Sequence, residues 1–188
     1  MTEISSIYHL DSSKLEFADE VSALARNKMR ECYNCGKCTA GCPVANKMNP
    51  PVHKIMELVQ MGRREELLTS QSIWYCVSCE TCSTRCPKQC YPSHVIDALR
   101  EIALREDKIP PEVRHIVAFH KALMNSIRHH GRLYEIGMIR EHKFETFRFF
   151  DDLSLGIRMF LKGKIRFFPH RMKDRKSIER IFERYWKD

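Results

Sequence analysis

The sequence lacks the motifs that mark a nucleotide, flavin or phosphate site. It contains no Gly-x-Gly-x-x-Gly fingerprint, no P-loop and no pair of adjacent cysteines. Glycine is scarce, at 7 of 188 residues, and long stretches lack the alternating β-branched pattern of strands. These absences argue against a flavin, nucleotide or substrate site on this chain and favour a mainly α fold.

The sequence also shows no targeting segment or membrane span. It has no N-terminal apolar region followed by a small-residue cleavage site, and its longest uncharged run, Leu67 to Cys79, is too short and too polar to cross a bilayer. We therefore expect a cytoplasmic protein. Because thiols stay reduced in that compartment, its nine cysteines predict metal binding instead of disulfides.

Eight of the nine cysteines fall in two runs with the same spacing, Cys-x2-Cys-x2-Cys-x3-Cys-Pro. This spacing is the bacterial ferredoxin arrangement for iron–sulfur clusters. Structural zinc sites instead use pairs of ligands separated by a longer spacer. The sequence therefore predicts two [4Fe-4S] clusters, with a [3Fe-4S] cluster as a weaker alternative at either site. The first run is Cys32, Cys35, Cys38 and Cys42, and the second is Cys76, Cys79, Cys82 and Cys86.

The fourth cysteine of each run binds the other cluster in two-cluster ferredoxins. If this chain crosses over in the same way, cluster 1 is held by Cys32, Cys35, Cys38 and Cys86, and cluster 2 by Cys76, Cys79, Cys82 and Cys42. The ninth cysteine, Cys90, could be an alternative ligand, a redox-active thiol or an inert small hydrophobe. The complete set of eight favours the inert role.

The two cysteine loops differ in their small residues. A loop that curls around a cluster needs unusual backbone angles, and Gly36 and Gly41 are expected to supply them in the first loop. The second loop has no glycine. Its small polar residues either hydrogen-bond to cluster sulfur or simply fit a tight turn; they are Ser78, Ser83 and Thr84.

The repeat extends past the cysteines into the helices that follow them. The residues Pro92, His94, Ile96 and Leu99 echo Pro51, His53, Ile55 and Leu58, so the repeated unit is a loop followed by a helix. Because cysteine fills all eight cluster positions, we expect the two histidines to cap helices or form hydrogen bonds.

The pattern predicts three segments. They are an N-terminal helical lead (1–30), an α-helical two-cluster ferredoxin domain (31–107) and a helical C-terminal region (108–188), with a break near Pro110-Pro111. The last region combines aromatics and arginine, as protein interfaces do, so we expect it to dock on a partner. Packing onto the ferredoxin domain is the alternative. The aromatic residues are Phe144, Phe147, Phe149, Phe150, Phe160, Phe167, Phe168 and Trp186, and the arginines are Arg148, Arg158, Arg166, Arg171 and Arg175.

The formal net charge of +8 overstates how basic the protein is. Coordinating cysteines must be thiolates, so two bound clusters would add on the order of −4 in total. No recognisable nucleic-acid module accompanies the basic residues. We therefore expect no nucleic-acid partner.

With both cysteine runs, the helix between them and the Arg- and Phe-rich tail, the chain resembles the iron–sulfur (C-type) subunit family of CoB–CoM heterodisulfide reductases, enzymes of methanogenesis. Its cysteine part is similar to the α-helical ferredoxin domain of fumarate reductase iron–sulfur subunits. The family's eight ligand positions match the two cysteine runs without a gap. The family's catalytic cysteine-rich (CCG) motif has no counterpart here, so the resemblance implies that catalysis lies on a partner.

The resemblance implies a non-catalytic electron-transfer subunit of a cytoplasmic oxidoreductase complex. A flavin-containing (A-type) subunit would supply electrons by bifurcation, and the two [4Fe-4S] clusters would pass them to a catalytic (B-type) subunit, which reduces the heterodisulfide CoM-S-S-CoB. A hydrogenase or a formate dehydrogenase would feed such a complex.

Two other functions compete with this one. The first is the iron–sulfur subunit of a glycolate or glycerol-phosphate type dehydrogenase; the succinate type is disfavoured because no cysteine precedes Cys32 to form its additional Cys-x4-Cys-x2-Cys motif. The second is a structural protein whose clusters serve only stability or nucleic-acid binding, which predicts salt-sensitive binding to DNA or RNA.

Overall fold

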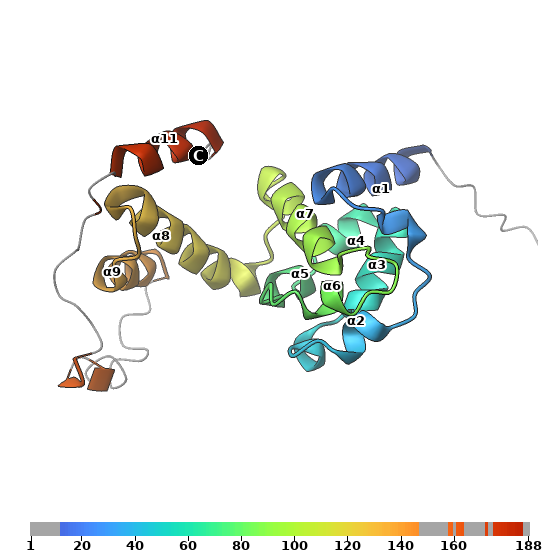
Figure 1. Ribbon diagram of the computed structural model, residues 1–188, viewed down its shortest axis with the longest axis horizontal. Coiled ribbons are helices and arrows are strands. Elements are labelled where there is room, and N and C mark those ends of the chain that lie inside the picture. Colours follow the sequence, from blue (N-terminus) through green and yellow to red (C-terminus); the bar gives the residue numbers. More distant parts are fainter. Residues whose placement is uncertain (1–11, 147–157, 160, 164–171, 173–174, 186–188) are drawn as a thin grey trace, which may run out of the picture. The chain divides into compact units, whose positions relative to one another are not determined.

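The structure, a computed structural model, describes residues 12–146, 158–159, 161–163, 172 and 175–185 (Figure 1). Within these ranges every regular element is helical and none is a strand, which confirms the mainly α prediction. None of the described helices is both long enough and apolar enough to cross a membrane. The chain divides into two compact units, Met1–Val113 and Arg114–Asp188.

The first unit consists of helices and short helical turns joined by the two cysteine loops. The longer helices are α1 (Ser12–Ala25), α3 (Val52–Gln60) and α7 (Pro92–Arg105). The shorter elements are η1 (Met29–Glu31), α2 (Lys37–Ala40), η2 (Ala45–Lys47), α4 (Arg64–Leu68), α5 (Ser72–Tyr75), α6 (Thr81–Thr84) and η3 (Pro111–Val113).

The core of this unit lies where α7 packs against α1, α3 and α4. Proline begins α7 because the first helical position needs no backbone donor. Its apolar face is fully buried and includes Val95, Leu99 and Ile102. In α1, Phe17 and Val21 are also buried. Burial of these side chains provides the main driving force for folding of the unit.

Helix α3 is followed by a glycine that closes its C-terminal end. Gly62 has a φ of +68°, a conformation that suits glycine after a helix. Its N–H donates to the carbonyl of Val59 at 3.0 Å, and the N–H of Arg63 donates to that of Leu58 at 2.9 Å. These bonds satisfy carbonyls that the helix leaves without partners.

An ion-pair network around Arg64 joins α4 to α1 and to the end of α7. The guanidinium lies 2.7 Å from a carboxylate oxygen of Glu20 and also pairs with Glu106. It stacks over the ring of Phe17, 5.0 Å from the centroid. The Glu106 carboxylate also lies 2.8 Å from the ammonium of Lys108. The guanidinium of Arg64, followed by the ammonium of Lys108, lowers the pKa of Glu106 to about 2.

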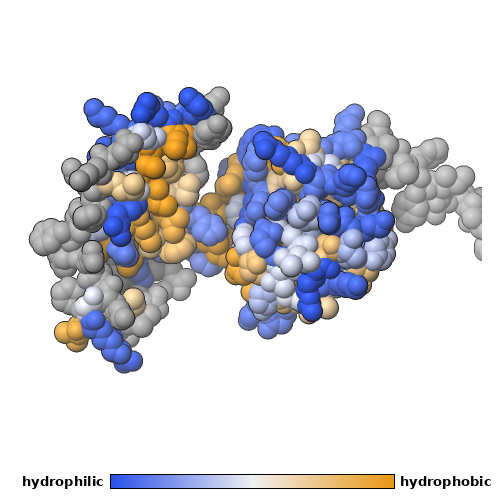
Figure 2. Space-filling view, viewed as in Figure 1, coloured by the Kyte–Doolittle hydropathy of each residue, from blue (hydrophilic) through white to orange (hydrophobic). Residues whose placement is uncertain are grey.

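The second unit contains α8 (Arg114–His130), α9 (Glu135–Thr146) and α11 (Arg175–Tyr185), and α8 packs against both of the others. Apolar side chains gather on the face of this unit that Figure 2 presents. The exposed large apolar residues of this unit include Phe119, Ile139, Phe144 and Ile181. Of the aromatic and arginine residues predicted to dock on a partner, those outside the described residues are Phe147, Phe149, Phe150, Phe160, Phe167, Phe168, Trp186, Arg148, Arg166 and Arg171.

Candidate metal centre

Two pockets of the first unit are each lined by four cysteines of the two runs. The pocket that we call the first-run pocket contains three cysteines of the first run and the last cysteine of the second run. The second-run pocket contains three cysteines of the second run and the last cysteine of the first run. The hollows measure about 310 and 320 Å³, including space open to solvent. The first-run pocket contains Cys32, Cys35, Cys38 and Cys86, and the second-run pocket contains Cys76, Cys79, Cys82 and Cys42.

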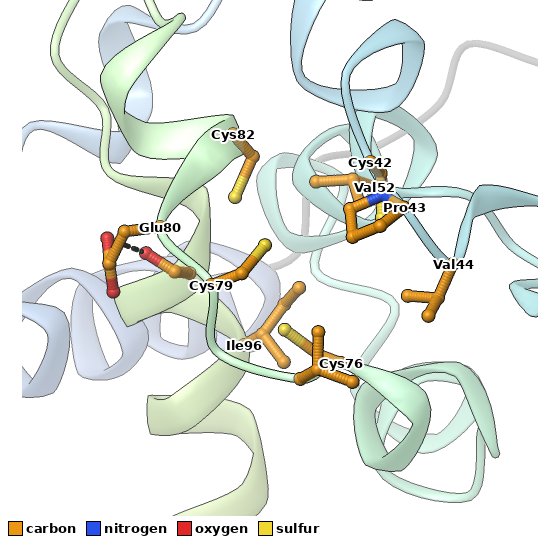
Figure 3. Close-up of a pocket in the computed structure, with 11 residues that line it drawn as sticks. Cys42, Pro43, Val44, Val52, Cys76, Cys79, Glu80, Cys82 and Ile96 are labelled. Carbon is orange, nitrogen blue, oxygen red and sulfur yellow. Dashed lines mark hydrogen bonds between the residues drawn. The ribbon is translucent and has the colours of Figure 1, made fainter.

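Figure 3 shows the second-run pocket in detail. The side chains of Cys76, Cys79 and Cys82 turn toward a common space, and Cys42 lies across it beside Pro43. Apolar side chains from the neighbouring segments complete the wall; they are Val44, Val52, Val77 and Ile96. The pocket therefore offers sulfur donors in apolar surroundings, which suits a cluster held by thiolates.

The backbone repeats between the two loops as closely as the cysteine spacing does. Cys32 has φ and ψ of −66° and 123°, and Cys76 has −61° and 125°. Four residues further on, Gly36 and Glu80 are both in the left-handed region, with φ of 76° and 60°. The two loops are therefore conformational copies of each other.

Glu80 occupies the left-handed position that glycine occupies in the first loop. A side chain in this region costs about 1–2 kcal/mol. The carboxylate of Glu80 accepts a hydrogen bond from the hydroxyl of Ser93 at 2.6 Å, which helps to offset this cost (Figure 3). Comparison of the two runs position by position could have identified Glu80, because it aligns with Gly36.

The prediction for the two glycines of the first loop is right at one and wrong at the other. Gly36 uses a positive φ, as expected. Gly41 does not, since its φ and ψ of −100° and −1° are open to any residue. What Gly41 provides is space, because a Cβ at this position would lie 2.3 Å from Nη1 of Arg85.

The first two turns of α3 and of α7 contribute to the walls of both pockets. Val52 of α3 and Ile96 of α7 line the second-run pocket, whereas Met56 and Pro92 of the same helices line the first-run pocket. The N-terminal end of a helix favours negative charge. Both helices therefore begin where a thiolate-ligated cluster, which is anionic, would be stabilised.

The two repeated histidines take part in local interactions. The Thr39 hydroxyl oxygen accepts a hydrogen bond from the backbone N–H of His53 at 3.0 Å and lies 2.8 Å from its Nδ1. Thr39 thus caps the start of α3 from the first loop. His94 stacks on Tyr91 and has its Nε2 3.8 Å from the Glu80 carboxylate.

The small hydroxyls of the second loop all have protein partners. The Ser83 and Ser93 hydroxyls are hydrogen-bonded at 2.5 Å, and the Thr84 hydroxyl donates to the carbonyl of Glu80 at 3.0 Å. The Ser78 hydroxyl accepts from Nη1 of Arg100 at 3.4 Å. Because Ser93 donates to Glu80, Ser83 donates to Ser93. The protons of Ser83 and Thr84 are therefore both used within the protein, which favours the tight-turn interpretation for these two residues. The Ser78 contact uses only its oxygen and leaves both interpretations open there.

Exposure of the cysteines follows their order in the run. Cys35 and Cys79, the second cysteines, are exposed, whereas Cys38 and Cys82, the third, are buried. Burial raises the pKa of the Cys82 thiol to about 11, whereas a hydrogen bond with Thr81 lowers the pKa of Cys79. A bound metal deprotonates its thiol ligands, so binding would reverse the upward shift.

Cys90 lies in the wall of the first-run pocket, as a fifth cysteine there. Its side chain is fully buried, and its backbone N–H donates to the sulfur of Cys86 at 3.3 Å. Burial, followed by the proximity of Cys86, raises the pKa of its thiol to about 12. The amide of Cys90 therefore supports a predicted ligand, whereas its own thiol is held in the neutral form.

The residues of both pockets fit an iron–sulfur cluster. Among the side chains that the structure describes, no three of His, Cys, Asp and Glu converge to hold a single metal ion. The thiols surround hollows instead, as the ligands of a cube must. Four sulfur donors, apolar walls and left-handed turns at matching positions together fit a [4Fe-4S] group better than zinc.

A family model of the 4Fe-4S dicluster domain matches residues 28–90, which include both cysteine runs. Residues 28–90 are a 4Fe-4S dicluster domain. Its name agrees with the two four-cysteine pockets, and the domain contains α3 and all eight cysteines of the two runs.

Beyond this domain match, the chain is similar to several curated proteins. It is 30% identical over 109 residues to an iron–sulfur (C 2) subunit of the CoB–CoM heterodisulfide reductase of Methanocaldococcus jannaschii, covering 54% of this chain and 58% of that one. It is 25% identical over 104 residues to the C-type subunit of the H2:CoB–CoM heterodisulfide,ferredoxin reductase of Methanothermobacter thermautotrophicus, covering 55% and 56%.

A protein of Archaeoglobus profundus, described as similar to the C-type heterodisulfide reductase subunit, is 30% identical over 96 residues, covering 47% of this chain and 48% of that protein. The chain thus spans about half the length of these curated relatives. The similarity to C-type subunits supports the resemblance noted from the cysteine runs.

Proposed function

We propose that the chain is the electron-transfer subunit of a heterodisulfide reductase complex. The observation that carries electron transfer is the exchange of Cys42 and Cys86 between the two pockets, which gives each pocket four sulfur donors. The similarity to C-type subunits supports the choice of complex. Cluster 1 would be held by Cys32, Cys35, Cys38 and Cys86, and cluster 2 by Cys76, Cys79, Cys82 and Cys42. A [4Fe-4S] cluster, when bound, supplies reversible electron transfer.

The surrounding residues are suited to this task. All ligand positions would be filled by cysteine, so neither cluster would offer an open position to a substrate. The exposed second cysteines, Cys35 and Cys79, would bring one edge of each cluster to the surface. The exposed side chains of Tyr33 and Val77 stand beside them at matching positions. Each cluster would therefore have its own surface for electron exchange, while the buried Cys38 and Cys82 face the core.

The second unit would dock the chain on its partners. It carries 18 Lys and Arg against 9 Asp and Glu, whereas the first unit carries 14 against 15, so the basic excess of the chain lies entirely in the second unit. Exposed apolar residues such as Phe144 and Ile181 accompany this charge. Apolar residues with arginine are typical of protein interfaces.

The expected partners are a flavin-containing (A-type) subunit, which delivers electrons, and a catalytic (B-type) subunit, which reduces CoM-S-S-CoB. A hydrogenase or a formate dehydrogenase would supply the complex. The names of the similar proteins, one of which includes H2, support this choice. The alternative function is that of the iron–sulfur subunit of a glycolate or glycerol-phosphate type dehydrogenase. Such a subunit would hold the same clusters, so the two functions differ only in the partner that the chain binds.

Anaerobic affinity purification of the tagged full chain from its native cells tests the proposal. The flavin-containing and catalytic subunits of heterodisulfide reductase should co-purify in fixed stoichiometry, and the purified complex should reduce CoM-S-S-CoB. Recovery of a glycolate or glycerol-phosphate dehydrogenase with no heterodisulfide reductase activity would contradict it. Salt-sensitive retention of DNA or RNA without a redox partner would also contradict it.

A further inference from the structure

Arg100 of α7 binds the backbone at the entrance to the second cysteine loop. Its Nε donates to the carbonyl of Ile73 at 2.6 Å, and its Nη2 donates to those of Trp74, at 3.3 Å, and Cys76. These carbonyls belong to the end of α5 and to the first cysteine of the run. A single guanidinium thus satisfies the end of that helix and fixes the residue that begins the loop.

Gln60 of α3 does the same for the first loop with a neutral side chain. Its Nε2 donates to the carbonyl of Cys32 at 2.9 Å and to that of Arg30 at 3.4 Å. In both halves, the helix that follows a cysteine loop therefore sends one polar side chain to the carbonyl of the loop's first cysteine. The two cysteines have the same backbone conformation, so the two contacts hold equivalent points of the repeat.

The contact made by Arg100 differs from that made by Gln60 in that Arg100 carries a positive charge. The Arg100 side chain is only 13% exposed, so solvent screens its charge less than that of a surface arginine. Its carboxylate partner, Asp97, lies 3.2 Å away but is 51% exposed, which weakens the compensation. A cation close to a cluster ligand stabilises the added electron and raises the reduction potential of the cluster.

We propose that Arg100 is the positioning residue of the second cysteine loop and that its charge raises the reduction potential of cluster 2. This inference rests on the proposed function, since it assumes that the two pockets hold clusters. Gln60 positions the first loop without this electrostatic effect. Both loops would therefore be held by a hydrogen bond to the carbonyl of their first cysteine, but only cluster 2 would have its reduction potential raised by a nearby charge.

The experiment measures iron content and the two midpoint potentials of the anaerobically purified full chain, by an electron paramagnetic resonance redox titration. In Arg100→Gln, which keeps an amide donor as at position 60, iron should stay near the wild-type value and only one midpoint potential should fall. In Arg100→Lys, which keeps the charge, that potential should move less. In Arg100→Ala, iron should fall from about eight toward about four per chain.

Gln60→Ala is the matched control, because it removes the equivalent contact from the first loop without removing a charge. It should lose cluster 1 and leave the potential of cluster 2 unchanged. Far-UV circular dichroism checks that each variant is folded, and Arg100→Gln and Arg100→Lys carry the test if Arg100→Ala does not fold.

An unchanged pair of potentials in Arg100→Gln, or an equal fall in both, would overturn the inference. If the wild-type protein in the same experiment holds about eight irons and shows two redox transitions, the two-cluster proposal is still supported even though the inference about Arg100 fails. Wild-type protein with about four irons would overturn the two-cluster proposal and this inference together.

Discussion

Cys42 and Cys86, the last cysteines of their runs, are exchanged between the two pockets. Cys42 lies with Cys76 and Cys82, and Cys86 lies with Cys32 and Cys38. Neither four-cysteine set can form without both loops being folded. We therefore expect replacement of a fourth cysteine to damage the cluster that is built mainly by the opposite loop.

Replacing Cys86 by Ser should destroy the cluster built mainly by the first loop. The physical reason is that Cys86 supplies the fourth thiolate of the first-run pocket. Iron analysis with electron paramagnetic resonance should show loss of cluster 1 and retention of cluster 2. The matched variant, Cys42→Ser, should show the reverse. Selective loss of cluster 2 in Cys86→Ser would refute the crossover.

Replacing Cys90 by Ser should leave the iron content intact. Cys90 lines the first-run pocket, but the four other cysteines there complete a ligand set, and burial keeps its thiol neutral. Its backbone N–H still reaches the sulfur of Cys86 in the variant. Metal analysis of the anaerobically purified variant measures the outcome, and loss of half the iron would identify Cys90 as a ligand.

The helices and the two cysteine runs could be predicted from the sequence, because both depend on short-range spacing, whereas the expected exchange of Cys42 and Cys86 came from the two-cluster ferredoxin pattern. Proline and apolar periodicity locate α7, and the Cys-Pro pattern with its doubled spacing leads to the four-cysteine sets that the pockets contain. The contact between Arg100 and the carbonyl of Cys76 could not be predicted from the sequence, because tertiary packing brings together residues that are 24 positions apart.

The sequence was also a poor guide to backbone conformation inside the loops. Glycine indicated a positive φ at Gly36 but not at Gly41, where a neighbouring side chain takes up the space. Glu80 has a positive φ although no local feature of its residue type requires it, because Ser93 and the repeated loop geometry hold it there. Tertiary contacts therefore determine the backbone conformation at Glu80 and the need for glycine at position 41.

Replacing Thr39 by Ala should destabilise the first unit by about 1 kcal/mol, because the start of α3 loses its hydrogen-bond acceptor. Urea unfolding under anaerobic conditions, compared with wild type, measures the change. Thr69→Ala is the control, since the exposed Thr69 hydroxyl donates only to the carbonyl of Glu65 in its own helix. The control should stay within about 0.5 kcal/mol of wild type, and an equal effect of both variants would contradict the capping role.

The Glu106 carboxylate should make the stability of the first unit depend on acid pH. Because Arg64 and Lys108 lower its folded pKa to about 2, from 4.5, the carboxylate stabilises the fold fully above the unfolded value and loses this contribution as pH falls toward 2. The free energy of unfolding of wild type should exceed that of Glu106→Gln by a constant amount from pH 7 to about pH 5.

That difference should shrink as pH falls below about 4.5. Urea unfolding at a series of pH values measures it, and Glu112→Gln, which changes an exposed carboxylate, is the control. A difference that stays constant to pH 3, or that grows on acidification, would show that the ion-pair network does not stabilise the fold in this way.

The most direct test of the two-cluster account is the metal content of the full chain purified without oxygen. The account predicts about eight irons and eight acid-labile sulfides per chain, with two reducible [4Fe-4S] signals in electron paramagnetic resonance. Zinc should be absent. About four irons per chain, or zinc in a fixed ratio to protein, would contradict it.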